Sequence, residues 1–174
     1  FHPQEPDRYQ FCGEWLDAEV IPETIRIKGR ARPHIERVTL THHGPIISDV
    51  IGLPGQRLAI RSMALQPCHV LRGWLLLNQA RGWEEFVEAV RQIEAPHLNV
   101  IYADVEGNIG YWLTGRVPLR ARGQGTLPVP GWNGEYEWVG EIPFAEMPHA
   151  LNPEQGYVLS CNNRIVPEDY PYFL

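Results

Sequence analysis

Two pairs of residues in this chain have side chains whose type and spacing suit chemistry. His42 and His43 are adjacent imidazoles that could ligate a metal ion, and Asp104 and Glu106 are carboxylates that could share acid–base work. Neighbouring residues on a strand point to opposite faces, however, and no acid or cysteine is suitably spaced to complete a metal site with the histidines. A solvated turn accounts more simply for the two carboxylates. Local spacing by itself therefore predicts neither a metal site nor an acid–base pair.

Two further patterns argue against cofactor binding within the chain. Residues 123–125 read Gly-Gln-Gly without the Lys and Ser or Thr of a phosphate-binding loop, so they indicate a flexible turn. Cys12, Cys68 and Cys161 are an odd number of thiols at wide spacings. Such spacing is typical of structural thiols and not of a disulfide framework or a zinc knuckle. We therefore expect no cofactor in this chain.

The composition is that of a globular chain and excludes two classes of partner. With 174 residues and 44% apolar content, the chain can bury one sizeable core, or one core and a small lobe. A net charge of -6 without any Lys- or Arg-rich run argues against nucleic acid. The longest apolar run, residues 74–77, is far shorter than the roughly 20 residues of a membrane helix. The first residues resemble no signal peptide and the last are aromatic, so we expect an interior piece of a larger protein.

The elements that must position these residues begin with a β-rich part. Alternating apolar and polar residues at 24–29 and 37–41 predict two strands, the first of them half-buried. Residues 42–45 end the second run, and residues 45–48 lead toward a third strand. We therefore expect a β-rich N-terminal lobe over residues 1–65.

The second part, residues 66–174, mixes helices with strands. Residues 70–77 are apolar nearly all round, which predicts a short buried helix. From Trp83 to Ile93 apolar residues recur at helical spacing, and Pro96 ends this second helix. A hairpin is predicted next, followed by an ordered loop rich in Gly, Pro and aromatic residues, at residues 99–104 and 109–113 and then 115–140. The predicted fold class is α+β.

A series of motifs resembles the penicillin amidase family. The run Tyr-Ala-Asp-Val-Glu-Gly-Asn-Ile-Gly-Tyr at residues 102–111 is similar to a hallmark hairpin of that family. Other segments resemble the family in the same order, namely residues 13–15, 23–25, 41–47, 127–131, 135–140, 142–144, 152–157, 162–163 and 169–171. Each motif is weak alone, but so many at compatible spacings make chance similarity improbable. The resemblance covers essentially the whole chain and identifies it as an interior fragment of the family's β chain.

The resemblance implies an N-terminal-nucleophile hydrolase with a layered αββα fold. In that family a Ser, exposed by cleavage of a precursor, attacks an amide carbonyl while its own α-amine acts as the base. Substrates would be penicillins, acyl-homoserine lactones or similar N-acyl compounds. Residue 1 here is Phe, so the nucleophile is expected upstream of Phe1 and the isolated fragment is expected to be inactive.

Three residues can be carried over from the family's active site. Asn162, the first of an Asn-Asn pair, matches the asparagine that donates an N–H to the oxyanion of the tetrahedral intermediate. Trp74 and Leu98 match positions that line the acyl pocket, although ordinary core packing would explain both without a ligand. Cys161 precedes Asn162 but cannot replace the nucleophile, because it lacks a free α-amine.

The resemblance also implies partners outside this chain. The rest of the parent's α and β chains would complete the enzyme, with a structural calcium ion held by acids that mostly lie elsewhere in the parent. Many relatives are periplasmic or secreted. Strand edges left open by missing neighbours would favour self-association of the fragment. The alternative function is a catalytically silent scaffold, or a segment that binds acylated ligands or proteins.

Overall fold

The computed structural model describes residues 1–53, 55–161 and 163–174, and these form two compact units. Unit 1 comprises Phe1–Leu65 and Arg120–Glu137, and unit 2 comprises Gln66–Leu119 and Trp138–Leu174. Helices and mainly antiparallel strands make an α+β fold, as the sequence predicts. These units are compact groups of residues in contact and do not test the predicted division into domains at residues 1–65 and 66–174, which stays a prediction.

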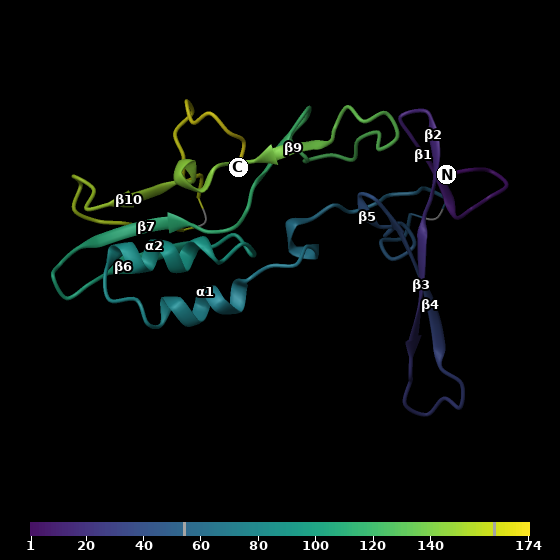
Figure 1. Cartoon of the computed structure of the whole chain (residues 1–174), viewed down its shortest axis with the longest axis horizontal. Helices are drawn as coiled ribbons and strands as arrows, with labels where there is room; N and C mark the ends of the chain where they lie inside the picture. Colours follow the sequence, from purple (N-terminus) through teal and green to yellow (C-terminus); the bar gives the residue numbers. More distant parts are fainter. Residues whose placement is uncertain (54, 162) are drawn as a thin grey trace. The chain divides into compact units, whose positions relative to one another are not determined.

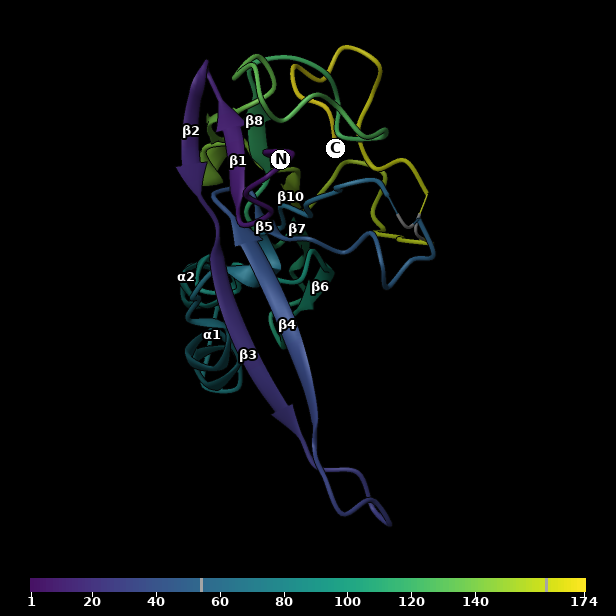
Figure 2. The same ribbon diagram turned by 90° about the vertical axis from the view of Figure 1, so that its right-hand side faces the viewer.

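Unit 1 is built from short antiparallel strands. Its elements are β1 (Arg8–Phe11), β2 (Glu14–Asp17), β3 (Glu19–Ile25), β4 (His34–Thr41), β5 (Gly44–Pro45) and the 3-10 turn η1 (Met63–Leu65). β1 pairs with β2, and β3, β4 and β5 form a sheet in that order. Figure 2 shows β3 and β4 as a long two-stranded ribbon.

The predicted strand at residues 24–29 is wrong in its bounds. β3 begins at Glu19 and ends at Ile25, and residues 26–33 connect it to β4. Ile25 and Ile27 are 48% and 36% exposed, so the alternation does not mark a half-buried face. A ribbon of two strands has too little surface to bury either face, and the strand ends where its pairing with β4 ends.

Unit 2 packs two helices on a small sheet. Its elements are α1 (Val70–Leu77), α2 (Trp83–Arg91), β6 (Asn99–Ala103), β7 (Ile109–Leu113), β8 (Pro118–Arg120, whose last residue is in unit 1), β9 (Trp138–Glu141), η2 (Phe144–Glu146) and β10 (His149–Leu151). The sheet order is β10-β7-β6, with every pair antiparallel, and β8 pairs with β9. Figure 1 shows α1 and α2 side by side, with α2 next to β6 and β7. β8 and the start of β9 lie within the segment 115–140 that was predicted to be all loop, so that prediction holds only between the two strands.

The core of unit 2 lies between α2 and the β6–β7 hairpin. Phe86 and Val90 of α2 pack against Tyr102 of β6 and Trp112 of β7, and all four are at most 9% exposed. Acidic residues occupy the first turn of α2, where they complement the helix dipole. The predicted second helix is therefore confirmed, because its apolar spacing creates one continuous buried face.

Helix α1 has the predicted bounds but not the predicted burial. Leu71 and Leu75 are 77% and 63% exposed in this chain, whereas Gly73 is buried. The close approach at Gly73 brings the helix against α2 along one side, where Leu77 also packs on the core, so Leu71 and Leu75 remain outside that contact. None of the helices within the described residues is long and apolar enough to span a membrane.

The predicted hairpin is confirmed, and its turn is organised by Asp104. The Asp104 carboxylate accepts hydrogen bonds from the Tyr102 hydroxyl at 2.8 Å, from the backbone N–H groups of Glu106 and Asn108 at 2.9 Å each, and from the Asn108 side chain at 2.8 Å. The simpler interpretation of Asp104 and Glu106 as turn residues accounts for these contacts. Asp104 thus stabilises the loop that joins β6 to β7.

Candidate functional site

The structure describes two of the three sequence-predicted site residues, Trp74 and Leu98, and both belong to unit 2. Asn162 lies outside the described residues. Beside it in the sequence, the Cys161 backbone N–H donates to Asn163 Oδ1 at 3.1 Å, and Asn163 Nδ2 donates to the Arg164 carbonyl at 2.9 Å. Asn163 is therefore engaged with the backbone around it.

The two predicted pocket residues lie on different elements of unit 2. Trp74 is on α1 and is 40% exposed, and Leu98 directly precedes β6. The backbone of Leu98 is held on both sides by Thr114, which is fully buried: the Leu98 N–H donates to Thr114 Oγ1 at 3.0 Å, and the Leu98 carbonyl accepts from the Thr114 N–H at 2.9 Å. The role of Trp74 and Leu98 in an acyl pocket stays a prediction.

The structure also reveals a polar cluster in unit 1 that begins at the β4–β5 hairpin. Thr41 pairs with Gly44, so His42 and His43 are the two turn residues between the strands. Thr41 Oγ1 accepts a hydrogen bond from the His43 N–H at 3.2 Å and donates to the Gly44 carbonyl at 3.2 Å. The expectation that the two imidazoles point apart is therefore wrong, because it applied the geometry of a strand to residues that form a turn.

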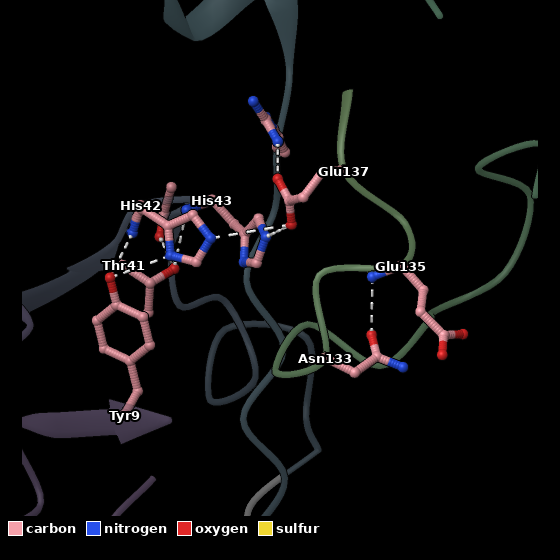
Figure 3. A network of polar contacts seen from close by, with 9 residues as sticks. Tyr9, Thr41, His42, His43, Asn133, Glu135 and Glu137 are labelled. Carbon is pink, nitrogen blue, oxygen red and sulfur yellow. Dashed lines mark hydrogen bonds and ion pairs between the residues drawn. The ribbon is translucent and has the colours of Figure 1, made fainter. Parts of the chain in front are cut away.

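Tyr9 of β1 anchors one side of this hairpin turn. The Tyr9 hydroxyl accepts a hydrogen bond from the His42 backbone N–H at 3.1 Å and lies 3.1 Å from His42 Nδ1. The His42 and His43 rings are 3.7 Å apart between centroids, and Figure 3 shows both near Glu137. The two rings are thus held side by side and do not lie on opposite faces.

Glu137 completes the cluster from a position 94 residues after His43 in the sequence. Glu137 Oε1 lies 2.5 Å from His43 Nε2 and 3.9 Å from His42 Nε2. The other carboxylate oxygen, Oε2, accepts a hydrogen bond from the Arg61 guanidinium at 2.6 Å. One carboxylate therefore joins two imidazoles and a guanidinium.

The surroundings of the cluster shift the pKa values of two of its members. Partial burial lowers the pKa of His42 below its ordinary value, and the neighbouring His43 and Arg61 lower it further against the opposing effect of Glu137. Partial burial raises the pKa of Glu137, but hydrogen bonds and charges from His43 and Arg61 outweigh this and leave it lowered. The carboxylate is thus ionised at neutral pH, and the His42 ring is uncharged.

Sequence reasoning found the histidines but missed Glu137, Arg61 and Tyr9. The Gly-Pro pair after His43 was used to end the predicted strand, but the consequence that the two histidines lie in the turn was not drawn. Glu137 stands in a segment whose sequence shows no periodicity and whose place in unit 1 depends on tertiary contacts. No local pattern connects it with the hairpin.

Comparison with known proteins shows the family of the chain. The penicillin amidase family profile matches residues 1–174. The acyl-homoserine lactone acylase QuiP of Pseudomonas aeruginosa is 37% identical over 93% of the chain and 20% of its own length. Penicillin G acylase of Escherichia coli is 34% identical over 97% of the chain and 20% of its own length. The chain thus spans about a fifth of the length of these two curated relatives.

A solved structure is similar across nearly the whole fold. The thermostable penicillin G acylase from Alcaligenes faecalis matches with a TM-score of 0.82 and 32% identity, over 97% of this chain and 30% of that one. The sequence and the fold agree in showing that this chain belongs to the penicillin amidase family.

Proposed function

We propose that this chain is part of an amide hydrolase that cleaves a linear amide bond of N-acyl compounds. The observation that carries the proposal is the match of the whole chain, residues 1–174, to a family whose relatives are named as penicillin and acyl-homoserine lactone acylases. The N-terminal Ser nucleophile that the family resemblance implies would come from another part of the parent, since the chain spans about a fifth of the length of these relatives. Isolated, the fragment is expected to be inactive.

Asn162 is the catalytic residue that we assign to this chain. Its side-chain N–H would stabilise the oxyanion of the tetrahedral intermediate. The Asn163 side chain is occupied by hydrogen bonds with the backbone of Cys161 and Arg164, which supports assigning the role to the first asparagine of the pair.

Trp74 and Leu98 are the residues that we assign to the acyl pocket. An aromatic and an aliphatic wall suit a phenylacetyl-like or fatty acyl chain. The two hydrogen bonds between Thr114 and the backbone of Leu98, one donated by each residue, support the assignment because they hold the Leu98 backbone in one position. Trp74 keeps 40% of its surface available for such a contact.

The remainder of the parent would complete the fold around unit 2. We propose that its sheet belongs to the αββα core, with α2 covering one face and a second sheet covering the other. Ile101, which is 49% exposed on β6, is the kind of residue that such a layer would cover. A structural calcium ion, if the parent holds one, would be bound by acids that mostly lie outside this chain.

The test is hydrolysis of a chromogenic phenylacetyl anilide and of an acyl-homoserine lactone by the full-length processed parent. Asn162→Ala should lower kcat by about 100- to 1,000-fold, as loss of one oxyanion donor does elsewhere. Asn163→Ala serves as the matched control and should keep most of the activity. An Asn162→Ala protein with unchanged kcat would contradict the assignment, and a parent that neither self-processes nor hydrolyses either substrate would favour the silent scaffold.

A further inference from the structure

We propose that unit 1 contains a binding site for a divalent transition-metal ion of the Zn²⁺ type, with His42 Nε2, His43 Nε2 and Glu137 Oε1 as its ligands. The three residues offer donor atoms that all lie within 4.8 Å of one another. The proposal concerns ion binding alone and does not rest on amide hydrolysis.

The distances between the donor atoms are close to those of a metal-bound arrangement. Zn²⁺ bonds of 2.0–2.2 Å in a tetrahedral site place neighbouring ligand atoms about 3.4 Å apart. Glu137 Oε1 lies 2.5 Å from His43 Nε2 and 3.9 Å from His42 Nε2, one below and one above that separation. Small rotations of the three side chains are therefore enough to give the separations of a zinc site, because the backbone already brings the donor atoms together.

Tyr9 prepares His42 to act as a ligand. Zinc-bound histidines generally donate a hydrogen bond from the ring nitrogen that does not bind the metal. The Tyr9 hydroxyl, 3.1 Å from His42 Nδ1, provides that acceptor and leaves the Nε2 lone pair directed toward Glu137. Tyr9 is 8% exposed, so its position is restricted by packing.

The donor set favours a transition metal over calcium or magnesium. Two imidazole nitrogens and one carboxylate oxygen suit Zn²⁺, Co²⁺, Ni²⁺ or Cu²⁺, whereas calcium takes six to eight oxygen ligands. The side chains of His42, His43 and Glu137 are 30%, 17% and 25% exposed, so an ion and a water ligand can reach them. Such a site would differ from the structural calcium proposed for the parent.

Substitution of Arg61 can distinguish a metal site from a simple ion-pair network. Its guanidinium is bound to Glu137 Oε2, and the metal would take Oε1, so both cations can share the carboxylate. Removal of Arg61 breaks the ion pair with Glu137 but leaves all three ligands in the chain. A metal site should survive this change, whereas the histidine and glutamate substitutions should abolish it.

The experiment measures Zn²⁺ binding to the full-length protein after chelator treatment, by isothermal titration calorimetry and by elemental analysis of dialysed samples. After dialysis, the wild-type protein should retain one more equivalent of Zn²⁺ than the His42→Gln or the Glu137→Gln variant. Their Kd should rise by more than about 100-fold, since loss of a second-shell partner alone costs about 10- to 100-fold in affinity. Tyr9→Phe, which removes only the hydrogen-bond partner of a ligand, should raise the Kd by about 10- to 100-fold. Arg61→Gln should keep the ion.

His34→Gln is the matched control, because His34 also pairs with an acid, Glu36, at 2.9 Å in an exposed setting. It should bind Zn²⁺ as wild type does. Co²⁺-loaded wild type, which requires no variant to fold, should show intense tetrahedral d–d absorption. Equal Zn²⁺ content in wild type and His42→Gln, or loss of the ion in Arg61→Gln, or Co²⁺ spectra like those of the aqueous ion, would each overturn the proposal.

Discussion

At the scale of single residues, Asp104 shows how one carboxylate organises a turn. Four hydrogen bonds converge on its two oxygens, one from Tyr102, one from Glu106 and two from Asn108. The Asn108 side chain is the largest cause that lowers the pKa of Asp104 to about 2, and the Tyr102 hydroxyl and backbone N–H groups add to it against partial desolvation. The folded state therefore favours the ionised carboxylate.

Asp104→Asn should lower the thermal unfolding midpoint at pH 7, because the amide nitrogen cannot accept the hydrogen bonds that one carboxylate oxygen now receives. The folded pKa of about 2 is below the ordinary value of 3.8, so the stabilisation is full above pH 4 and is lost as pH falls through about 2. The difference between the midpoints of wild type and variant should shrink over that window. Glu106→Gln, an exposed neighbour, is the control, and a pH-independent difference would contradict the account.

At the scale of elements, the contact between α1 and α2 depends on a residue without a side chain. Gly73 of α1 is buried against the C-terminal end of α2. A Cβ atom at this position would lie 2.6 Å from Ile93 Cγ1 and 3.0 Å from the Gln92 carbonyl carbon. Ile93 is fully buried, so it has little room to move away. The small residue therefore sets how closely the two helices approach.

Gly73→Ala should destabilise the protein although alanine is the better helix former. The clash costs about 1–3 kcal/mol of unfolding free energy, against a gain of about 1 kcal/mol from helix propensity. Denaturant unfolding followed by circular dichroism measures the difference. Gly140→Ala, at a position where a Cβ would meet only Leu119 Cδ1 at an ordinary 3.8 Å, should change stability by about 1 kcal/mol or less. A stabilised Gly73→Ala protein would show that the helices can separate at little cost.

At the scale of the whole molecule, the chain leaves apolar surface and strand edges uncovered. β6 and β10 are the outer strands of the unit 2 sheet among the described residues. Ile101 on β6 is 49% exposed, and Leu151 on β10 is 42% exposed. Open edges with apolar side chains are templates for pairing with another chain. The remainder of the parent is the partner that we expect to cover them.

The chain expressed without that partner should self-associate, and Ile101→Lys should reduce the association because a lysine on an edge strand opposes pairing. Sedimentation velocity over a range of concentrations measures the effect. Val105→Lys is the matched control, since Val105 is fully exposed in the turn outside the strand. A wild-type chain that stays monomeric, or equal association in both variants, would contradict the role of β6.

The local spacing of apolar residues was sufficient to predict the elements in which the apolar side chains are also the buried ones. The spacing from Trp83 to Ile93 predicts α2, and the two strand-like runs at residues 99–104 and 109–113 predict the β6–β7 hairpin. The same reasoning was wrong where packing did not follow the pattern. It extended a strand through residues 24–29, although its pairing ends at Ile25, and it buried the whole of α1, which packs along one side.

The sequence by itself determined the family and the α+β class, and it named Asn162, Trp74 and Leu98 as the residues to test. Only the tertiary structure brought Glu137 to His43, 94 residues away in the chain. Periodicity reports which side of a helix or strand is apolar, and it contains no information about which distant polar groups will meet. Such a meeting depends on how a turn orients two side chains and on which loop packs beside it.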